Sequence, residues 1–145
     1  MKKGMFFVNA IRYYSRTGNT EKMAKLLGEQ LNLTPETIDK PLEGVVDKLF
    51  IGGGIYNTNV DKNLKEFTTN LDPTKVKEVV LFGTSGSVFT VGKQLGKILK
   101  KNGIPESNEH LYLHGLMPKL GNFNEHQKKE IQEFADKADK ESLKS

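Results

Sequence analysis

The alternation of buried strands with amphipathic helices is the feature that most constrains how this chain folds. Apolar runs that suit strands are expected at 5–14, 34–39, 48–54, 77–84 and 109–114. Helical patterns, with apolar residues three and four positions apart, are expected at 21–31, 60–71, 91–102 and 124–138. Strands that alternate with helices predict an α/β fold with a parallel sheet and right-handed crossovers.

One crossover lacks room for a full helix. Only a short, glycine-containing segment, Pro41 to Asp47, separates the second expected strand from the third. We therefore expect the second helix to be reduced or absent. The first strand also contains two polar residues, Asn9 and Arg12, and a buried Arg12 would need a partner or would have to reach the edge of the sheet.

Length and composition restrict the possible chemistry. A chain of 145 residues is expected to form one domain, 1–145, with a proper hydrophobic core. There is no cysteine, which excludes disulfides, thiolate catalysis and cysteine-ligated metal clusters. Redox chemistry would have to come from a bound cofactor. The N-terminal apolar run is interrupted by Asn9 and Arg12, so we expect neither a signal peptide nor a membrane span, and a cytoplasmic protein.

The charge pattern does not favour nucleic-acid binding. The formal net charge is +4, and the lysines are scattered along the sequence among 18 acidic residues. A basic stripe is not visible in the sequence, so a solvated surface is the expected role of these side chains.

The stretch from Ser15 to Thr20 is the first candidate binding site. It lies between the first expected strand and the first expected helix, Gly18 allows a tight turn, and the helix directs unpaired N–H groups into the loop. This arrangement suits a phosphate group. The loop is a poor match for a triphosphate-binding loop, because that motif needs a second glycine and a Gly-Lys-Ser/Thr ending, whereas Asn19 follows Gly18. The alternative is a plain strand-to-helix turn capped by Thr20.

The segment Tyr13-Tyr14-Ser15-Arg16-Thr17-Gly18-Asn19-Thr20 resembles the phosphate loop of the flavodoxin superfamily, which binds flavin mononucleotide (FMN). The resemblance extends, more weakly, over most of the chain. It implies a flavodoxin-like, doubly wound, five-stranded parallel sheet of order 2-1-3-4-5. Ligands in such sheets bind where the carboxyl ends of neighbouring strands meet.

The same resemblance implies three groups of cofactor-binding residues. The phosphate would be held by Ser15, Arg16, Thr17, Gly18, Asn19 and Thr20, with the Arg16 side chain pointing outward. One side of the isoalloxazine ring would be flanked by Gly53, Gly54, Ile55, Tyr56 and Asn57. The other side would be flanked by Thr84, Ser85, Gly86, Ser87 and Phe89.

Two aromatic residues leave alternatives open, and no catalytic or metal-ligating set is found. Tyr56 either stacks on the flavin or packs against its own loop, and Phe89 either packs at the start of a helix or stacks on the ring. The three histidines, His110, His114 and His126, have no metal-ligand spacing with nearby carboxylates.

We expect a small FMN-dependent electron carrier. The main alternative is an FMN-dependent NAD(P)H:quinone reductase or a protoporphyrinogen-oxidase-like enzyme, which the segment from Ile51 to Tyr56 also resembles. A third possibility is a non-redox module that binds another phosphorylated ligand. The expected partners of a carrier are a reductase and an acceptor that are not strongly basic, since this chain carries a positive net charge. A monomer or weak dimer is expected.

Overall fold

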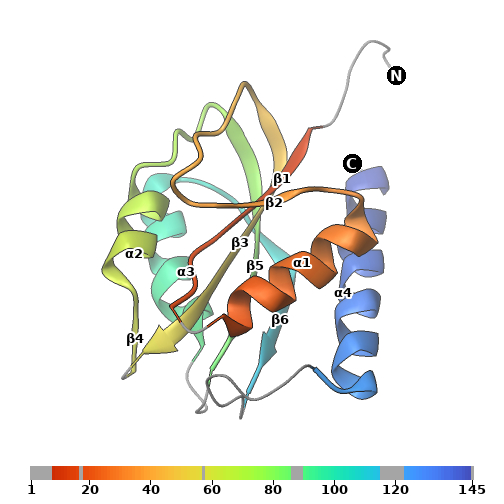
Figure 1. The fold of residues 1–145 in the computed structure, drawn as a ribbon. Helices are drawn as coiled ribbons and strands as arrows, with labels where there is room; N and C mark the ends of the chain where they lie inside the picture. Colours follow the sequence, from red (N-terminus) through yellow and green to blue (C-terminus); the bar gives the residue numbers. More distant parts are fainter. Residues whose placement is uncertain (1–7, 17, 57, 86–89, 115–122, 145) are drawn as a thin grey trace.

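A parallel sheet between two layers of helices forms the core of the protein (Figure 1). The computed structural model describes residues 8–16, 18–56, 58–85, 90–114 and 123–144. Its strands are β1 (Asn9–Tyr13), β2 (Pro35–Thr37), β3 (Val46–Tyr56), β4 (Asn59–Val60), β5 (Val76–Thr84) and β6 (Glu106–Leu113). Its helices are α1 (Asn19–Leu31), α2 (Lys62–Thr69), α3 (Val91–Asn102) and α4 (Glu125–Lys144).

The strand order confirms the expected topology. Five parallel strands run in the order β2-β1-β3-β5-β6, which is 2-1-3-4-5 when these five alone are numbered. The sixth strand was not expected. Where the sequence suggests a loop after Gly54, β3 continues to Tyr56 and pairs antiparallel with the two residues of β4. Thr58, with a φ of 71°, lies in the turn between these strands.

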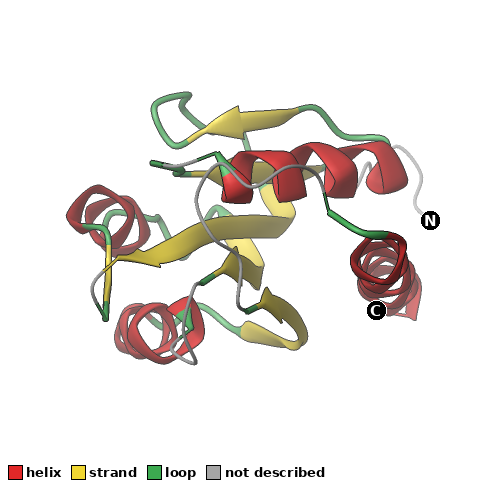
Figure 2. Cartoon of the chain, turned by 60° about the horizontal axis from the view of Figure 1, so that its bottom comes forward, coloured by secondary structure: helices red, strands yellow, loops and turns green. Residues whose placement is uncertain are grey.

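The two faces of the sheet are buried against different helices (Figure 2). Side chains of alternate residues point to opposite faces. Ile11, Phe50 and Phe82 contribute to the cluster that includes α1 and α4, and Phe50 meets Phe134 of α4 edge to face at 6.4 Å. Leu49 and Leu81 contribute to the cluster that includes α2 and α3. Burial on both faces explains why these strands read as continuous apolar runs.

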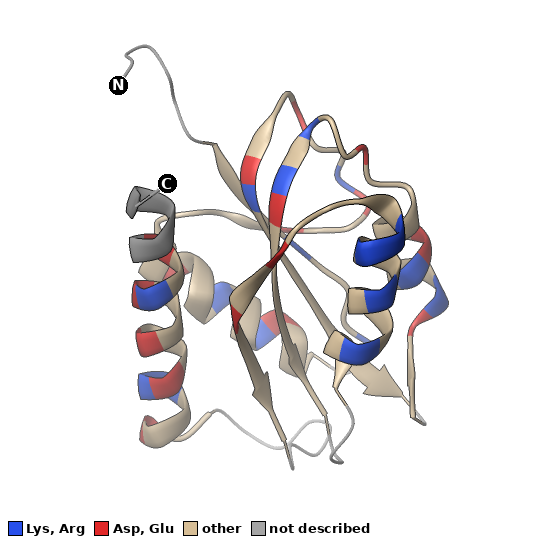
Figure 3. Cartoon of the chain, turned by 180° about the vertical axis from the view of Figure 1, so that it is seen from behind, with Lys and Arg blue, Asp and Glu red and all other residues tan. Residues whose placement is uncertain are grey.

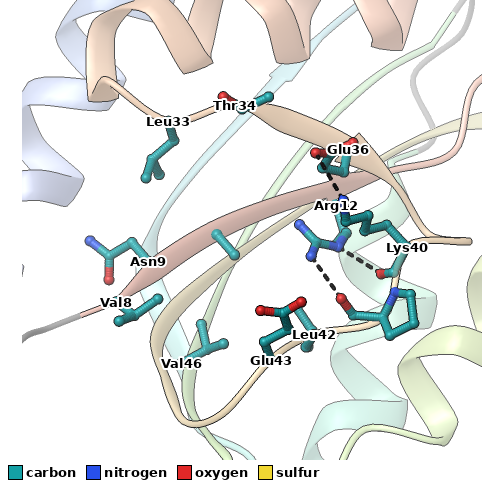
Figure 4. A pocket seen from close by; sticks show the side chains of 12 residues that line it. Val8, Asn9, Arg12, Leu33, Thr34, Glu36, Lys40, Leu42, Glu43 and Val46 are labelled. Atoms are coloured by element: carbon teal, nitrogen blue, oxygen red, sulfur yellow. Dashed lines mark hydrogen bonds and ion pairs between the residues drawn. The ribbon is translucent and has the colours of Figure 1, made fainter.

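The second crossover has no helix, as expected. The segment 38–45 is irregular, and Arg12 of β1 holds it in place (Figure 4). The Arg12 side chain donates from Nε to the carbonyl oxygen of Lys40 at 2.9 Å and from Nη2 to that of Pro41 at 3.1 Å. Burial lowers the pKa of Arg12, and the carboxylates of Glu36 and Glu43 partly oppose this effect. The arginine that is out of place in an apolar strand therefore anchors the loop that replaces a helix.

A cavity of about 300 Å³ remains beside this loop, lined by residues of β1, β2 and the segment 40–46. It lies over the part of the sheet that the missing helix would have covered. The second polar residue of β1, Asn9, has a separate role, because its Oδ1 accepts a hydrogen bond from the Lys48 amide at 3.0 Å and so aligns the start of β3.

Replacing Arg12 by Met should destabilise the protein by about 2–4 kcal/mol, because two loop carbonyls lose a charged donor and a buried anchor disappears. The measurement is the free energy of unfolding in urea, with Lys25→Met as control. Among the described residues Lys25 pairs only with the exposed Glu21, at 3.7 Å, so the control should change stability by less than about 0.5 kcal/mol. Equal stabilities of the two variants would show that Arg12 does not anchor the loop.

Candidate functional site

The carboxyl ends of β1, β3 and β5 lie at one edge of the sheet, at the bottom of Figure 1. A buried hydrogen bond connects two of the three segments that follow these strands. The hydroxyl of Thr20, in the first turn of α1, lies 2.8 Å from the hydroxyl of Thr84, the last residue of β5. Residues 64 positions apart in the chain are thereby brought into contact at this edge of the sheet.

The loop after β1 has the geometry expected of a phosphate cradle. Gly18 has a φ of 95°, a conformation that L side chains rarely adopt, so a glycine is needed at this position. The hydroxyl of Ser15 accepts a hydrogen bond from the Gly18 amide at 3.0 Å, which closes the turn. Helix α1 then begins at Asn19, two residues earlier than expected, and both Asn19 and Thr20 are buried. The amides of its first turn point toward the loop.

Arg16 lies differently from the expected orientation. Instead of pointing outward into solvent, its side chain reaches to the carboxylate of Asp61, with Nε 3.0 Å from Oδ2. Asp61 is the N-cap of α2, where its other oxygen accepts from the Asn63 amide at 2.7 Å. The guanidinium remains about half exposed, but it connects the loop after β1 to the segment after β4.

Tyr56 is held between these two segments. Its hydroxyl accepts a hydrogen bond from the Arg16 amide at 2.9 Å, and the Arg16 guanidinium lies over its ring at 4.3 Å from the centroid. In this arrangement Tyr56 packs against the loops, and its hydroxyl is bonded to the backbone. Burial raises the pKa of Tyr56, although the hydrogen bond from Arg16 opposes the shift.

Arg16 and Asp61 each stabilise the charged form of the other. Burial alone would raise the pKa of Asp61, but the hydrogen bonds from Arg16 and Asn63 outweigh it and hold that pKa below its ordinary value. The hydrogen bond to Asp61 raises the pKa of Arg16. Sequence reasoning missed Asp61 as a site residue; the only signal for it was an acid able to cap the helix that begins at residue 62.

The glycines at the ends of β3 and β5 allow close packing, whether or not a ligand binds beside them. A Cβ atom added at Gly53 would collide with the Leu64 side chain of α2, and one added at Gly83 would collide with the Gly53 carbonyl. At Gly54 an added Cβ would lie 3.2 Å from the Tyr56 hydroxyl. The backbones of β3 and β5 and the helix behind them therefore approach closely at this edge of the sheet.

The third segment begins at Thr84 and Ser85, which are both buried. The Ser85 amide donates to the carbonyl of Leu113 at 2.9 Å, which joins this segment to β6. Ile55 lies in β3 and pairs with Val60. The remaining expected site residues lie outside the described residues: Thr17, Asn57, Gly86, Ser87 and Phe89.

The histidines are not drawn together into a site. His110 stacks on Tyr112 of the same strand, with ring centroids 4.8 Å apart, and His126 pairs with Glu130 along α4. Within the described part of the chain, no group of three His, Asp or Glu side chains could hold a metal ion. Among the helices described, none has the length and apolar character needed to cross a membrane.

Comparisons with known proteins identify what the chain is similar to. A family model described as a flavodoxin domain matches residues 10–142. An uncharacterised protein of Methanocaldococcus jannaschii is 32% identical over 91 residues, which span 59% of this chain and 60% of that protein. The match therefore spans less than two thirds of this curated relative.

Two solved structures share the fold. A flavodoxin from the domain Archaea superposes with a TM-score of 0.77 at 11% identity, over 94% of this chain and 99% of the other. A short-chain flavodoxin associated with a non-canonical PDU bacterial microcompartment gives a TM-score of 0.70 at 17% identity, over the same 94% and 99%. At these identities the two structures show similarity of fold alone.

Asp61 should contribute to the pH dependence of stability. Because its folded-state pKa is lowered, its contribution is present above the unfolded-state pKa of about 3.9 and is lost as the pH falls through the folded-state pKa. In Asp61→Asn the amide can still cap α2, but the charge is gone. The stability difference between the wild type and this variant should therefore shrink as the pH is lowered from about 5 to about 3.

Urea unfolding at a series of pH values measures this effect. Asp39→Asn is the matched control, since Asp39 is exposed and forms no ion pair within the described residues. The control should keep the acid dependence of the wild type. If Asp61→Asn keeps it too, the ion pair with Arg16 does not contribute to stability.

Proposed function

Because the chain belongs to the flavodoxin family, whose members bind FMN, we propose that it acts as a small FMN-dependent electron carrier between redox partner proteins. The observation that supports this most directly is the convergence of the segments after β1, β3 and β5 at one edge of the sheet, joined by the hydrogen bond between Thr20 and Thr84. In doubly wound sheets this edge is where ligands bind.

The residues of this edge fit the parts of FMN. The turn closed by Ser15 and Gly18, with the first amides of α1, would hold the phosphate. The segments that begin at Gly53 and at Thr84 would flank the ring, with Tyr56 beside it. FMN, when bound, supplies the one- or two-electron chemistry, whereas the protein sets the environment of the ring through charge, hydrogen bonds and exposure.

The surroundings of this edge favour a carrier over an enzyme. A reductase needs walls that enclose its substrate and groups that move protons. Here the second crossover helix is absent, and the cavity beside its replacement loop is lined by residues of β1, β2 and that loop rather than by the described residues of 53–56 or 84–85. The ionisable pair beside Tyr56 is already engaged, because Arg16 and Asp61 bind each other.

The ion pair of Arg16 and Asp61, whose charges cancel, also affects the reduction potential expected of the flavin. Acidic groups close to the ring disfavour reduction to an anion. In the described parts of the ring-flanking segments, 53–56 and 84–85, there is no acid, and the charge of Asp61 is balanced by Arg16. We infer a less negative potential for full reduction than that of a flavodoxin with acids around its ring.

Ser15 should be required for FMN binding. In Ser15→Ala the Gly18 amide loses its acceptor and the cradle loses one hydroxyl, so FMN affinity should fall at least about tenfold. Ser107→Ala is the matched control, since the hydroxyl of Ser107 also accepts a hydrogen bond from a nearby amide, that of Glu109 at 3.0 Å, near the start of β6. Fluorescence titration of FMN measures both affinities. Equal affinities of the two variants would exclude this loop as the phosphate site.

The carrier function is tested by anaerobic titration of the FMN-loaded protein, followed by its visible spectrum. A carrier should accept electrons from dithionite in two resolved one-electron steps, and neither NADPH nor NADH should reduce it within minutes. Rapid two-electron reduction by either nucleotide would instead identify a reductase. A protein that remains colourless after incubation with excess FMN would support a non-redox phosphate-binding module.

A further inference from the structure

The two layers of helices differ in their balance of lysines and acids. Helix α3 contains four lysines and no acid, and α2 contains two lysines and one acid. By contrast, α4 contains five lysines and six acids, and α1 contains two of each. In Figure 3, blue bands follow one another along the helices at the right, while red and blue alternate along α4 at the left.

We name the outer surface of these two helices the lysine face. It consists of Lys62, Lys65, Lys93, Lys97, Lys100 and Lys101. On α3 the lysines follow one another at intervals of four, three and one, so they share one side of the helix, opposite the buried Val91, Leu95 and Leu99. Five of the six are exposed and Lys65 is half-buried, and none forms an ion pair within the described residues.

This face adjoins the candidate FMN site. The side chains of Leu64 in α2 and Val91 in α3 would be touched by Cβ atoms added at Gly53 and Gly83, so both helices begin directly behind the ends of β3 and β5. Gln94 of α3 accepts a hydrogen bond from the Val60 amide at 3.2 Å and donates one to the Thr58 carbonyl at 3.2 Å. Lys62 and Lys93 are therefore at the end of the face that borders the site.

We propose that the lysine face is the docking surface for an acidic redox partner protein. The proposal rests on the proposed function. An acidic partner would be drawn to the unpaired lysines and held with its own redox centre near the edge where the strands end, so that a single electron passes between the two cofactors without any bond being made or broken. Charge complementarity of this kind mainly raises the rate of association.

A protein partner fits this face better than a nucleic acid does. All six basic residues are lysines, which bind as flexible point charges, and the face lacks the arginines that recognise phosphates in pairs. It also lacks exposed aromatic rings on which bases could stack, because Phe67 of α2 is packed against the core. The lysine face also lies beside the proposed site of electron transfer, a position that matters for a redox partner but not for a nucleic acid.

The test compares two pairs of substitutions in the FMN-loaded protein. Lys93→Glu with Lys97→Glu reverses charge on the lysine face, and Lys129→Glu with Lys137→Glu does so on α4, where both residues are exposed. Each pair replaces two lysines by two glutamates, so each lowers the formal net charge from +4 to zero. Any difference between the pairs therefore reflects where the charge lies.

The probe is succinylated cytochrome c, an acidic protein whose ferric haem accepts one electron from the reduced flavin, mixed with each variant in a stopped-flow instrument. At low ionic strength the lysine-face variant should react about tenfold more slowly than the wild type, or slower still, whereas the α4 variant should lose less than about threefold. The rate of the wild type should fall steeply with added salt, and that of the lysine-face variant should change little. Unmodified, basic cytochrome c should not show the loss.

Other outcomes overturn the proposal. Equal losses in the two variants would mean that net charge alone matters, and unchanged rates would mean that the partner docks elsewhere. Tight binding of a short DNA duplex at physiological ionic strength, lost in the lysine-face variant, would assign the face to nucleic acid. In each of these cases FMN would still be bound and reduced, so the proposed function would stand. A protein that retains no FMN and reduces neither cytochrome would overturn both proposals.

Discussion

The site depends on the buried hydrogen bond between the hydroxyls of Thr20 and Thr84. It fixes the first turn of α1 against the end of β5, and so sets the distance between the loop suited to a phosphate and the segment suited to a flavin ring. A buried hydroxyl without a partner costs about 1–3 kcal/mol, so each threonine stabilises the position of the other. The left-handed turn at Gly18 and the close approach of Gly53 to Gly83 allow the backbones of these segments to lie this close together.

Most of the fold could be predicted because it depends on local patterns. Continuous apolar runs predict strands buried on both faces, and a short second connection predicts a missing helix. The contacts that hold the loop in place of the missing helix could not be predicted. Arg12 looks unfavourable in a central strand until its contacts with the Lys40 and Pro41 carbonyls are seen, because these partners lie 28 and 29 residues away. Likewise, a two-residue strand such as β4 has no pattern of its own.

The candidate site shows the same division between local and distant information. Its loops could be located from residue types that suit tight turns and phosphate binding. The partner of Arg16 could not, since Asp61 is 45 residues away and gives only a helix-cap signal. The charge distribution also emerges only on folding: the spacing of lysines along the sequence gives no stripe, yet α2 and α3 bring six of them onto one layer. The charge that each layer of helices carries thus depends partly on which helices become neighbours.

A crystal structure of the protein with FMN tests the central claim most directly, namely that the segments after β1, β3 and β5 form one flavin site. We expect the phosphate within hydrogen-bonding distance of the Gly18, Asn19 or Thr20 amides, and the ring between Tyr56 and the segment that begins at Thr84. FMN bound in the cavity beside Arg12, or a phosphate outside the loop after β1, would contradict this account.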